Sequence, residues 1–212
     1  MDTSFITVNA NSSVRIDAGD KVIYIDPFQI SDSAGDADYI FLTHEHYDHY
    51  SPEAVETVKK TDTVFVYPKG MDKKIKKGAH GGVYYPVAPG QKYDAKGLNF
   101  ETVASYNKLK PFHPKKCGNC GYLINVNGKK IYIAGDMDAT DEAKAVRCDI
   151  AIVPIGGFYT MDYKEAAKLI NIIKPGVAIP THYGDVAGKP TDGEEFAKLV
   201  DDGIQVDIKL KV

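Results

Sequence analysis

Several features that mark special classes of protein are scarce or missing in this sequence of 212 residues. It has three cysteines, Cys117, Cys120 and Cys148, and an odd number argues against a disulfide framework. No apolar run approaches the ~20 residues that a membrane span needs. The opening stretch MDTSFITVNANSSVRI lacks a basic segment followed by an apolar core, which a secretion signal would show. These absences favour a cytoplasmic protein with no membrane partner.

Positive charge is not in excess either. The formal net charge is −3, and the lysine-rich stretch KKIKK (73–77) is more typical of a solvated helix face than of a nucleic-acid patch. We therefore expect no nucleic-acid partner. With 43% hydrophobic and 26% charged residues, the composition is that of an ordinary globular protein. Repeats, low-complexity tracts and linkers are absent from the sequence, which predicts a single domain over residues 1–212.

Short apolar runs punctuated by Gly, Pro and Asp dominate the chain. They predict strands over 4–9, 13–19, 21–28, 38–44, 63–68, 149–157, 177–184 and 204–212. Helices are expected over 51–61, 69–78, 161–176 and 191–203. The stretch 81–107 indicates successive β-hairpins, and Asn127-Gly128 marks a further hairpin within 121–136. Strands come first, and strands and helices then alternate, which favours an α+β domain with stacked sheets and outer helices.

The stretch FLTHEHYDHYSP (41–52) carries three histidines, a glutamate and an aspartate within six positions. It can be a polar loop, a proton-relay site, an accidental run or a metal site. On an extended chain His44 and His46 project to the same side, because side-chain direction repeats every two residues. A turn before the helix near Ser51 can bring Asp48 and His49 back to the same cavity. This spacing after an apolar strand favours the metal site.

Two metal ions need more ligands than one turn supplies, so partners are expected later in the chain. IYIAGDMD places Asp136 just beyond a buried strand, and VAIPTHYG places His182 at the end of another. Taken singly, Asp136 is explained as a turn former and His182 as a core histidine. Their common position at strand ends, in this order, makes coincidence a poor explanation.

These motifs resemble those of the metallo-β-lactamase superfamily. HEHYDH matches the HxHxDH motif, AGDMD resembles the GD(T/S) element, PTHYG resembles the final histidine motif, and IYIDPF is similar to a segment common in the superfamily. The resemblance implies a four-layer αβ/βα sandwich with a binuclear metal site at one edge of two sheets. The stretches around 104–114 and 156–161 also look like a small-hydrolase branch related to ascorbate-6-phosphate lactonase-like proteins.

The resemblance also implies a role for each residue of the site. One ion would be held by His44, His46 and a further histidine; the other by Asp48, His49 and His182, with Asp136 as a bridge. The further histidine should lie at a strand end, where this chain has Asn107, a poor ligand for Zn²⁺. His113 is our choice and His80 is interpreted as a surface histidine, which leaves open a first site completed by His113 or left open at Asn107.

The metal site implies hydrolysis of a small-molecule substrate. A hydroxide bridging two divalent cations, Zn²⁺ by preference with Mn²⁺ or Fe also compatible, would attack an ester, lactone, amide or phosphodiester bond. Asp48 is the candidate catalytic proton carrier. Tyr159 and Asn107 are candidate substrate-binding residues, and Lys108 and Lys110 are weaker candidates for attracting an anionic substrate.

Other members of the superfamily fit less well. The Thr-Pro-Gly-His-Thr stretch expected of a glyoxalase II-like enzyme is absent from the sequence, and His46 stands where flavodiiron proteins typically have Glu. The alternatives kept are a catalytically quiet metal-binding or sensor protein and a di-iron redox protein. A homo-oligomer is left open.

Overall fold

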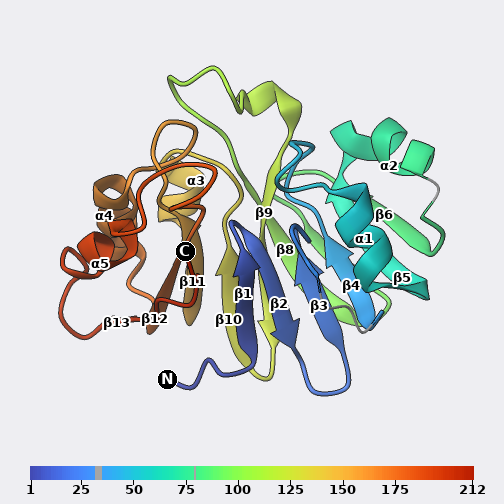
Figure 1. Ribbon diagram of the computed structural model, residues 1–212, viewed down its shortest axis with the longest axis horizontal. Helices are drawn as coiled ribbons and strands as arrows, with labels where there is room; N and C mark the ends of the chain where they lie inside the picture. Colours follow the sequence, from blue (N-terminus) through green and yellow to red (C-terminus); the bar gives the residue numbers. More distant parts are fainter. Residues whose placement is uncertain (32–34, 79) are drawn as a thin grey trace.

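Two β-sheets lie face to face in the computed structural model, which describes residues 1–31, 35–78 and 80–212 (Figure 1). Within these residues the first sheet has the order β1 (Ile6–Ala10), β2 (Ser13–Asp17), β3 (Val22–Ile25), β4 (Ala37–Phe41), β5 (Lys59–Pro68) and β6 (Val83–Val87). The second has the order β13 (Gln205–Val206), β12 (Val177–Thr181), β11 (Ile150–Pro154), β10 (Lys129–Ile133), β9 (Cys120–Val126), β8 (Leu98–Ala104) and β7 (Lys92–Ala95).

Each sheet has an antiparallel part and a parallel part. Strands β1 to β3 are antiparallel and β3 to β6 run parallel. In the second sheet β7 to β10 are antiparallel and β10 to β13 run parallel. Parallel neighbours need crossover connections. The carboxyl ends of the parallel strands therefore point to a common edge, where the loops after them meet.

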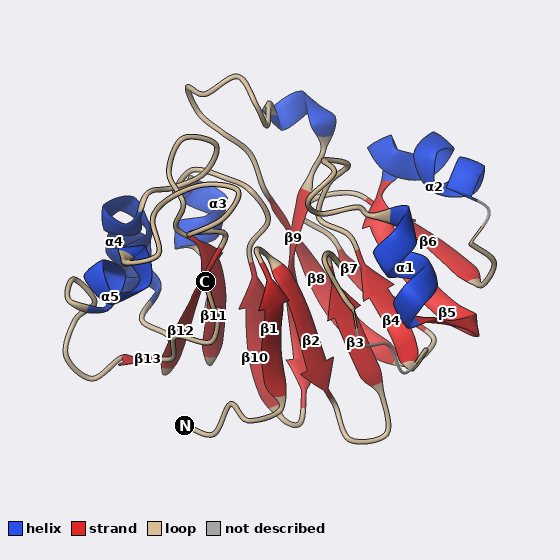
Figure 2. Ribbon diagram, in the orientation of Figure 1, coloured by secondary structure: helices blue, strands red, loops and turns tan. Residues whose placement is uncertain are grey.

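Helices cover both outer faces of the pair of sheets (Figure 2). Helices α1 (Pro52–Val58) and α2 (Asp72–Gly78) lie on the first sheet. Helices α3 (Asp141–Lys144), α4 (Tyr163–Ile173) and α5 (Asp192–Ala197) lie on the second, and short 3-10 turns occupy Lys69–Met71 and Lys115–Cys117. The α+β class and the four-layer αβ/βα sandwich expected from the sequence are confirmed.

Strand β4 shows why its sequence is apolar without alternation. Tyr39 and Phe41 face the core between the sheets, whereas Ile40 faces the helices of the outer layer. A strand that is buried on both faces is apolar throughout. The Phe41 ring makes edge contacts with Phe100 at 5.0 Å and Tyr122 at 4.9 Å between centroids, so this strand holds the two sheets together just before the histidine motif.

The start of helix α1 follows its capping signals. The Ser51 hydroxyl accepts a hydrogen bond from the Ala54 amide at 3.2 Å, and Pro52 occupies the first helical position. The helix ends at Val58, earlier than the predicted 61, because Lys59 adopts an extended backbone and begins β5. This short, capped helix fixes where the chain leaves the histidine motif.

Two predictions of strand arrangement are wrong. The stretch 81–107 does not form successive hairpins, because β6 pairs in parallel with β5 and only β7 and β8 form a hairpin. Pro86 lacks an N–H group and therefore suits the edge position that β6 takes in its sheet. The closing strand expected over 204–212 is reduced to Gln205–Val206. By contrast, the hairpin at Asn127-Gly128 is confirmed, with φ of +51° and +73° at these two residues.

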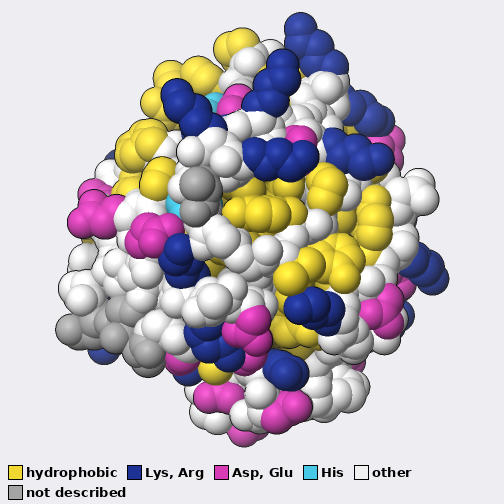
Figure 3. Space-filling model, turned by 90° about the vertical axis from the view of Figure 1, so that its right-hand side faces the viewer, with side chains coloured by type: hydrophobic (Ala, Val, Ile, Leu, Met, Phe, Trp, Pro, Cys, Tyr) yellow, Lys and Arg dark blue, Asp and Glu magenta, His cyan; other side chains and the backbone are white. Residues whose placement is uncertain are grey.

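The side of the molecule that carries β6 is shown in Figure 3. Hydrophobic side chains gather at the middle of this face among lysines and acidic residues. Half-buried Val83, Tyr84 and Tyr85 of β6 and Tyr93 of β7 pack against the cores at the open side of the sandwich. Among the helices of the described residues, none is long and apolar enough to cross a membrane.

Candidate metal centre

The predicted ligands lie at the common edge of the two sheets, which is the upper edge in Figure 1. His44 follows β4, Asp136 follows β10 and His182 follows β12. The loop between β8 and β9 rises above this edge and carries His113. Strand ends of both sheets thus bring together residues that are far apart in the sequence.

A tight turn explains how the histidine motif folds onto itself. The amides of His49 and Tyr50 donate hydrogen bonds to the carbonyl oxygen of His46 at 3.0 and 2.8 Å. This turn swings Asp48 and His49 back towards His44, as the spacing predicted. Glu45 and Tyr47 are exposed, and neither belongs to a group of residues that could hold a metal ion.

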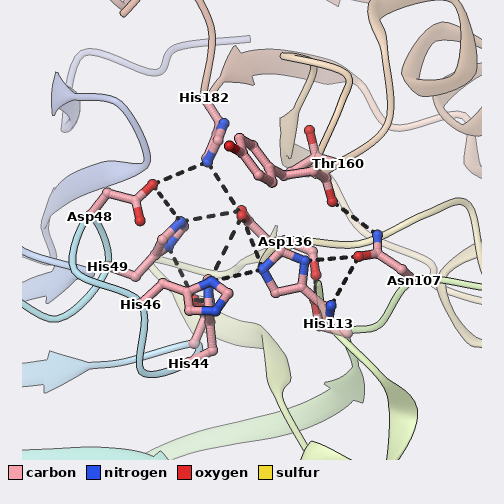
Figure 4. Close-up of polar contacts among 12 residues, drawn as sticks. His44, His46, Asp48, His49, Asn107, His113, Asp136, Thr160 and His182 are labelled. Carbon is pink, nitrogen blue, oxygen red and sulfur yellow. Dashed lines mark hydrogen bonds and ion pairs between the residues drawn. The ribbon is translucent and has the colours of Figure 1, made fainter. Parts of the chain in front are cut away.

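Three imidazoles form one half of the cluster (Figure 4). His46 Nδ1 lies 3.1 Å from His44 Nε2 and 3.0 Å from His113 Nε2. One ligand atom from each of the three can be chosen so that all lie within 4.8 Å of one another. The sequence left two possibilities for the first metal site, completion by His113 or a site left open at Asn107. The structure places His113, and not Asn107, beside His44 and His46.

The other half contains Asp48, His49 and His182. Asp48 Oδ2 lies 3.3 Å from His182 Nε2 and 3.5 Å from His49 Nε2. Asp136 stands between the two halves: its Oδ1 is 3.2 Å from His49 Nε2, and its Oδ2 is 3.3 Å from His182 Nε2 and 3.5 Å from His113 Nε2. The structure thus brings all seven predicted ligand residues together around Asp136 (Figure 4).

In three imidazoles of the cluster, the ring nitrogen Nδ1 contacts a polar side chain outside the set of ligands. His44 Nδ1 lies 3.0 Å from Thr43 Oγ1, and His49 Nδ1 lies 2.7 Å from Asp26 Oδ2. His113 Nδ1 lies 2.9 Å from Asn107 Oδ1. Partners of this kind orient metal-binding histidines and direct the other ring nitrogen to the ion.

Asn107 has a different position from the one expected of a substrate-binding residue. Its side chain is buried behind His113 and does not line the pocket. Besides the His113 ring, it contacts the carbonyl oxygen of Tyr159 and the carboxylate of Asp138 through Nδ2 at 3.0 and 3.2 Å. The carboxamide is thus committed to the protein itself.

Asn11 was missed by the sequence reasoning. Its Nδ2 donates to Asp48 Oδ2 at 3.0 Å, and its carbonyl oxygen accepts from the amide of His182 at 3.0 Å. It sits between β1 and β2 with φ of +47°, a backbone conformation that Asn tolerates better than most residues. An Asn between two predicted strands signals such a turn, but nothing in the sequence relates the turn to the cluster.

Burial and neighbouring charge set the protonation of these groups. Burial, with the nearby imidazoles, holds the pKa of His44 well below its ordinary value, and burial lowers the pKa of His113 to about 4. Burial also disfavours charge on His49 and His182, but neighbouring carboxylates outweigh it. Asp136 and Asp26 raise the pKa of His49 well above its ordinary value. Asp136 and Asp48 raise the pKa of His182 to about 9. The carboxylate at the centre therefore attracts positive charge, which a bound cation would also supply.

The spacing of the ligand atoms suits binding of a cation better than hydrogen bonding between the side chains. His49 Nε2 and Asp136 Oδ1 are buried and face each other at 3.2 Å, yet neither has a hydrogen-bond partner among the described residues. Nitrogens bound at about 2.1 Å to one tetrahedral ion lie roughly 3.4 Å apart. The nearest contacts between donor atoms in the two halves, 3.0 to 3.5 Å, are close to this separation.

A pocket of about 280 Å³ opens onto the cluster. Its floor is formed by His46, Asp48, His113, Asp136 and His182. Its walls are formed by Tyr47, Phe112, Tyr159 and Val186. Tyr159 thus lies where the sequence placed a candidate substrate contact.

His80, interpreted from the sequence as a surface histidine, is buried, and that interpretation is wrong. Its Nε2 lies 2.7 Å from the Tyr50 hydroxyl and its Nδ1 lies 2.7 Å from Glu56 Oε1. These contacts satisfy both ring nitrogens beside helix α1. His80 therefore has a structural place outside the metal cluster, and its burial follows from partners that the local sequence does not reveal.

Comparison with known proteins places the chain among related folds. The model of the β-lactamase superfamily domain matches residues 6–182. A protein of Thermococcus onnurineus named "UPF0173 metal-dependent hydrolase" is 32% identical over 200 residues, covering 89% of this chain and 88% of its own. One of the same name from Staphylothermus marinus is 33% identical over 202 residues, covering 88% and 84%.

Solved structures agree with the fold. The crystal structure of a protein from Parabacteroides distasonis, described as a metal-dependent hydrolase, matches with a TM-score of 0.81 and 31% sequence identity. The match covers 97% of this chain and 93% of that chain. The metallo-beta-lactamase fold protein YhfI from Bacillus subtilis has a TM-score of 0.74 at 13% identity, covering 96% and 91%. The latter likeness concerns the fold alone.

Proposed function

The chain belongs to the metallo-β-lactamase superfamily, and on this premise we propose that it is a metal-dependent hydrolase of a small-molecule substrate. The observation that carries the proposal is the arrangement of six His and Asp side chains in two halves around a seventh, Asp136. We assign one ion to His44, His46 and His113, and the other to Asp48, His49 and His182. Asp136 is assigned to both.

The donor set supports zinc. Imidazole and carboxylate are common ligands of Zn²⁺, although Mn²⁺ and Fe also bind such sets. When bound, such ions lower the pKa of water and polarise the bond to be broken, which can be an ester, lactone, amide or phosphodiester bond. The free state of Cys117, Cys120 and Cys148 supports a cytoplasmic location as part of the proposal.

The residues of the chain have separate tasks in this proposal. Asp48 lies at the pocket floor and carries a proton from the attacking water to the leaving group. Burial opposes the charged form of Asp48, but His182 and His49 outweigh it, and the pKa of Asp48 is lowered from its ordinary value. Asp26 and Asn107 position the imidazoles of His49 and His113.

Metal analysis together with chelation tests the proposed function. Freshly purified protein should contain about two metal ions per chain, as the two-metal arrangement requires. Treatment with EDTA should remove hydrolysis of esters, lactones, amides or phosphodiesters, and Zn²⁺ should restore it. Fewer than about one ion per chain, or hydrolysis that survives complete chelation, would contradict the proposal. Bound iron without hydrolysis would support the redox alternative instead.

A second prediction concerns Asn11 as a positioning residue. Asn11→Gly removes the amide that bonds Asp48, and glycine accepts the positive φ without strain. We expect kcat to fall about 10-fold, the size of effect that partners of metal-site residues produce. The matched control is Asn127→Gly, an exposed Asn that also has a positive φ. Equal kcat values for the two variants would contradict this role.

A further inference from the structure

The walls of the pocket differ in chemistry from its floor. The polar floor is formed by the cluster, whereas the wall residues Tyr47, Phe112, Tyr159 and Val186 are aromatic or aliphatic. Among the described residues, none that lines the pocket is a lysine or an arginine. A substrate that enters therefore meets apolar surface on its way to the cluster.

Aromatic side chains extend this surface to the rim. The rings of Phe112, Phe158 and Tyr159 contact one another with centroid distances of 4.7 to 5.4 Å. Phe158 is 70% exposed and Phe112 is 36% exposed. Tyr47, which also lines the pocket, is 69% exposed and makes an edge-to-face contact with Phe28 at 6.1 Å between ring centroids. We call Tyr47, Phe112, Phe158 and Tyr159 the aromatic rim.

Packing of the fold does not explain this rim. Phe158 has a φ of +33°, in the left-handed region that bulky residues rarely adopt. Most of its ring remains in solvent, so the strain is not offset by burial in a core. Exposed aromatic residues beside a pocket indicate a binding surface.

The two lysines near the His113 loop have acidic partners. Lys110 Nζ lies 2.7 Å from Asp138 Oδ1 and 2.5 Å from the carbonyl oxygen of Thr160. Lys108 Nζ lies 3.7 Å from Asp141 Oδ1. These lysines, considered from the sequence as anion attractors, instead neutralise acidic residues. Sites for phosphoryl groups present Arg, Lys or divalent cations to the phosphate oxygens, and among the described residues neither Arg nor Lys lines this pocket to assist the ions.

From these observations we propose that the substrate is a neutral carboxylic ester or lactone whose aryl or apolar group lies against the aromatic rim. The proposal rests on the proposed hydrolase function and names the substrate class of the same site. In the reaction, the oxygen of water bonds to the acyl carbon and the bond from that carbon to the alkoxy oxygen breaks. One proton of the water passes to the alcohol and the carboxylic acid releases the other.

The test compares three compounds with the zinc-loaded protein. Methyl phenylacetate and methyl acetate share a leaving group and differ by one phenyl ring, while bis(p-nitrophenyl) phosphate has aryl rings and a negative charge. We expect kcat/KM for methyl phenylacetate to exceed that for methyl acetate by about 10-fold or more, the selectivity that an apolar pocket provides. The phosphodiester should be the poorest substrate.

Variants of the rim separate recognition from catalysis. Phe112→Ala and Phe158→Ala should each lower the ratio of kcat/KM for methyl phenylacetate to kcat/KM for methyl acetate, and so remove most of the preference for the phenyl ester. The control is Leu109→Ala, on the same loop but 96% exposed and outside the pocket lining, which should keep the preference. Equal kcat/KM values for the two esters, or a preference for the phosphodiester, would overturn the inference and leave the hydrolase function standing.

A binding measurement distinguishes failure of the hydrolase function from failure of the inference. Saturation-transfer NMR with the metal-free protein should detect N-methylphenylacetamide, a neutral aryl compound, through its ring protons. The signal should weaken in Phe112→Ala and persist in Leu109→Ala. If no compound is hydrolysed but this pattern holds, the aryl site stands and the hydrolase function fails. An unchanged signal in Phe112→Ala overturns the aryl site.

Discussion

Exchange of Asp136 for Asn is expected to lower kcat/KM about 10³-fold or more, because removal of a shared ligand should exceed the roughly 10–100-fold effect of outer partners. The carboxylate lies within 3.5 Å of His49, His113 and His182, and thus touches both halves of the cluster. Asn preserves the shape of the side chain and removes its charge. A loss of activity would therefore report on metal binding rather than on a cavity.

Metal content gives this prediction a second readout. His46 contacts one half only, so His46→Ala should retain about one ion per chain, whereas Asp136→Asn should retain less than about one. The control is Asp149→Asn, whose carboxylate accepts the amide of Lys130 at the start of β10, away from the cluster. Unchanged metal content in both Asp136→Asn and His46→Ala would contradict the binuclear assignment.

Much of the candidate site could be predicted because its residues follow strands. Buried strands such as β4, β10 and β12 are recognisable as apolar runs, and His44, Asp136 and His182 stand directly after them. The carboxyl ends of parallel strands meet at one edge of each sheet, and the packing of the two sheets face to face brings these residues together. The order of strands and helices predicted an α+β domain with stacked sheets and outer helices, and the resemblance to the superfamily added the four-layer arrangement.

The position of His113 could not be derived in this way. It lies in an irregular loop, where no periodicity tells which side chain points to the sheet edge. The loop is closed by tertiary contacts: the Asn107 amide donates to the His113 carbonyl oxygen at 2.8 Å, and Asn107 Oδ1 accepts from the His113 amide at 3.1 Å. The superfamily pattern places the third histidine at position 107. Only the folded loop shows that His113 supplies this imidazole instead, and that Asn107 holds it in position.

The errors in strand assignment have a related cause. The strand character of 83–87 was recognised, but its partner is β5, which precedes it, and not β7, which follows. Local turn signals predict hairpins between neighbours and carry no information about a parallel partner beyond a helix. The stretch 204–212 alternates like a strand, yet outside Gln205–Val206 it contributes through contacts such as burial of Leu210.

Asp26 is the other residue whose replacement should have a large effect. It is fully buried, and its carboxylate accepts from the Thr43 amide at 2.7 Å and the Thr43 hydroxyl at 2.6 Å, besides its 2.7 Å contact with His49 Nδ1. Asp26→Ala leaves these buried groups without an acceptor. The free energy of unfolding should fall by about 3–5 kcal/mol, as for other broken buried pairs. Urea denaturation of the metal-free protein measures it, with Asp38→Ala at the opposite end of the sheet as control.

Asp26→Asn separates stability from metal binding, because Asn tolerates the φ of +47° at this position. If the amide oxygen accepts from the Thr43 amide, the NH₂ group faces His49 Nδ1, which must then be the unprotonated nitrogen. The ring proton moves to Nε2, the atom that faces Asp136, and this nitrogen can no longer bind a cation. In the reverse rotamer the NH₂ group of Asn would face the N–H of Thr43, so that two hydrogen-bond donors would oppose each other.

The shift of the ring proton to Nε2 should weaken metal binding by about 10–100-fold, while the loss in unfolding free energy stays nearer 1–3 kcal/mol. Competition with a chromophoric chelator measures the affinity, and Asp38→Asn should leave it unchanged. Wild-type affinity in Asp26→Asn would show that the Asp26 carboxylate does not set the protonation of His49. A deficit in affinity without a matching loss of stability would identify the buried carboxylate as the group that keeps His49 Nε2 available to the ion.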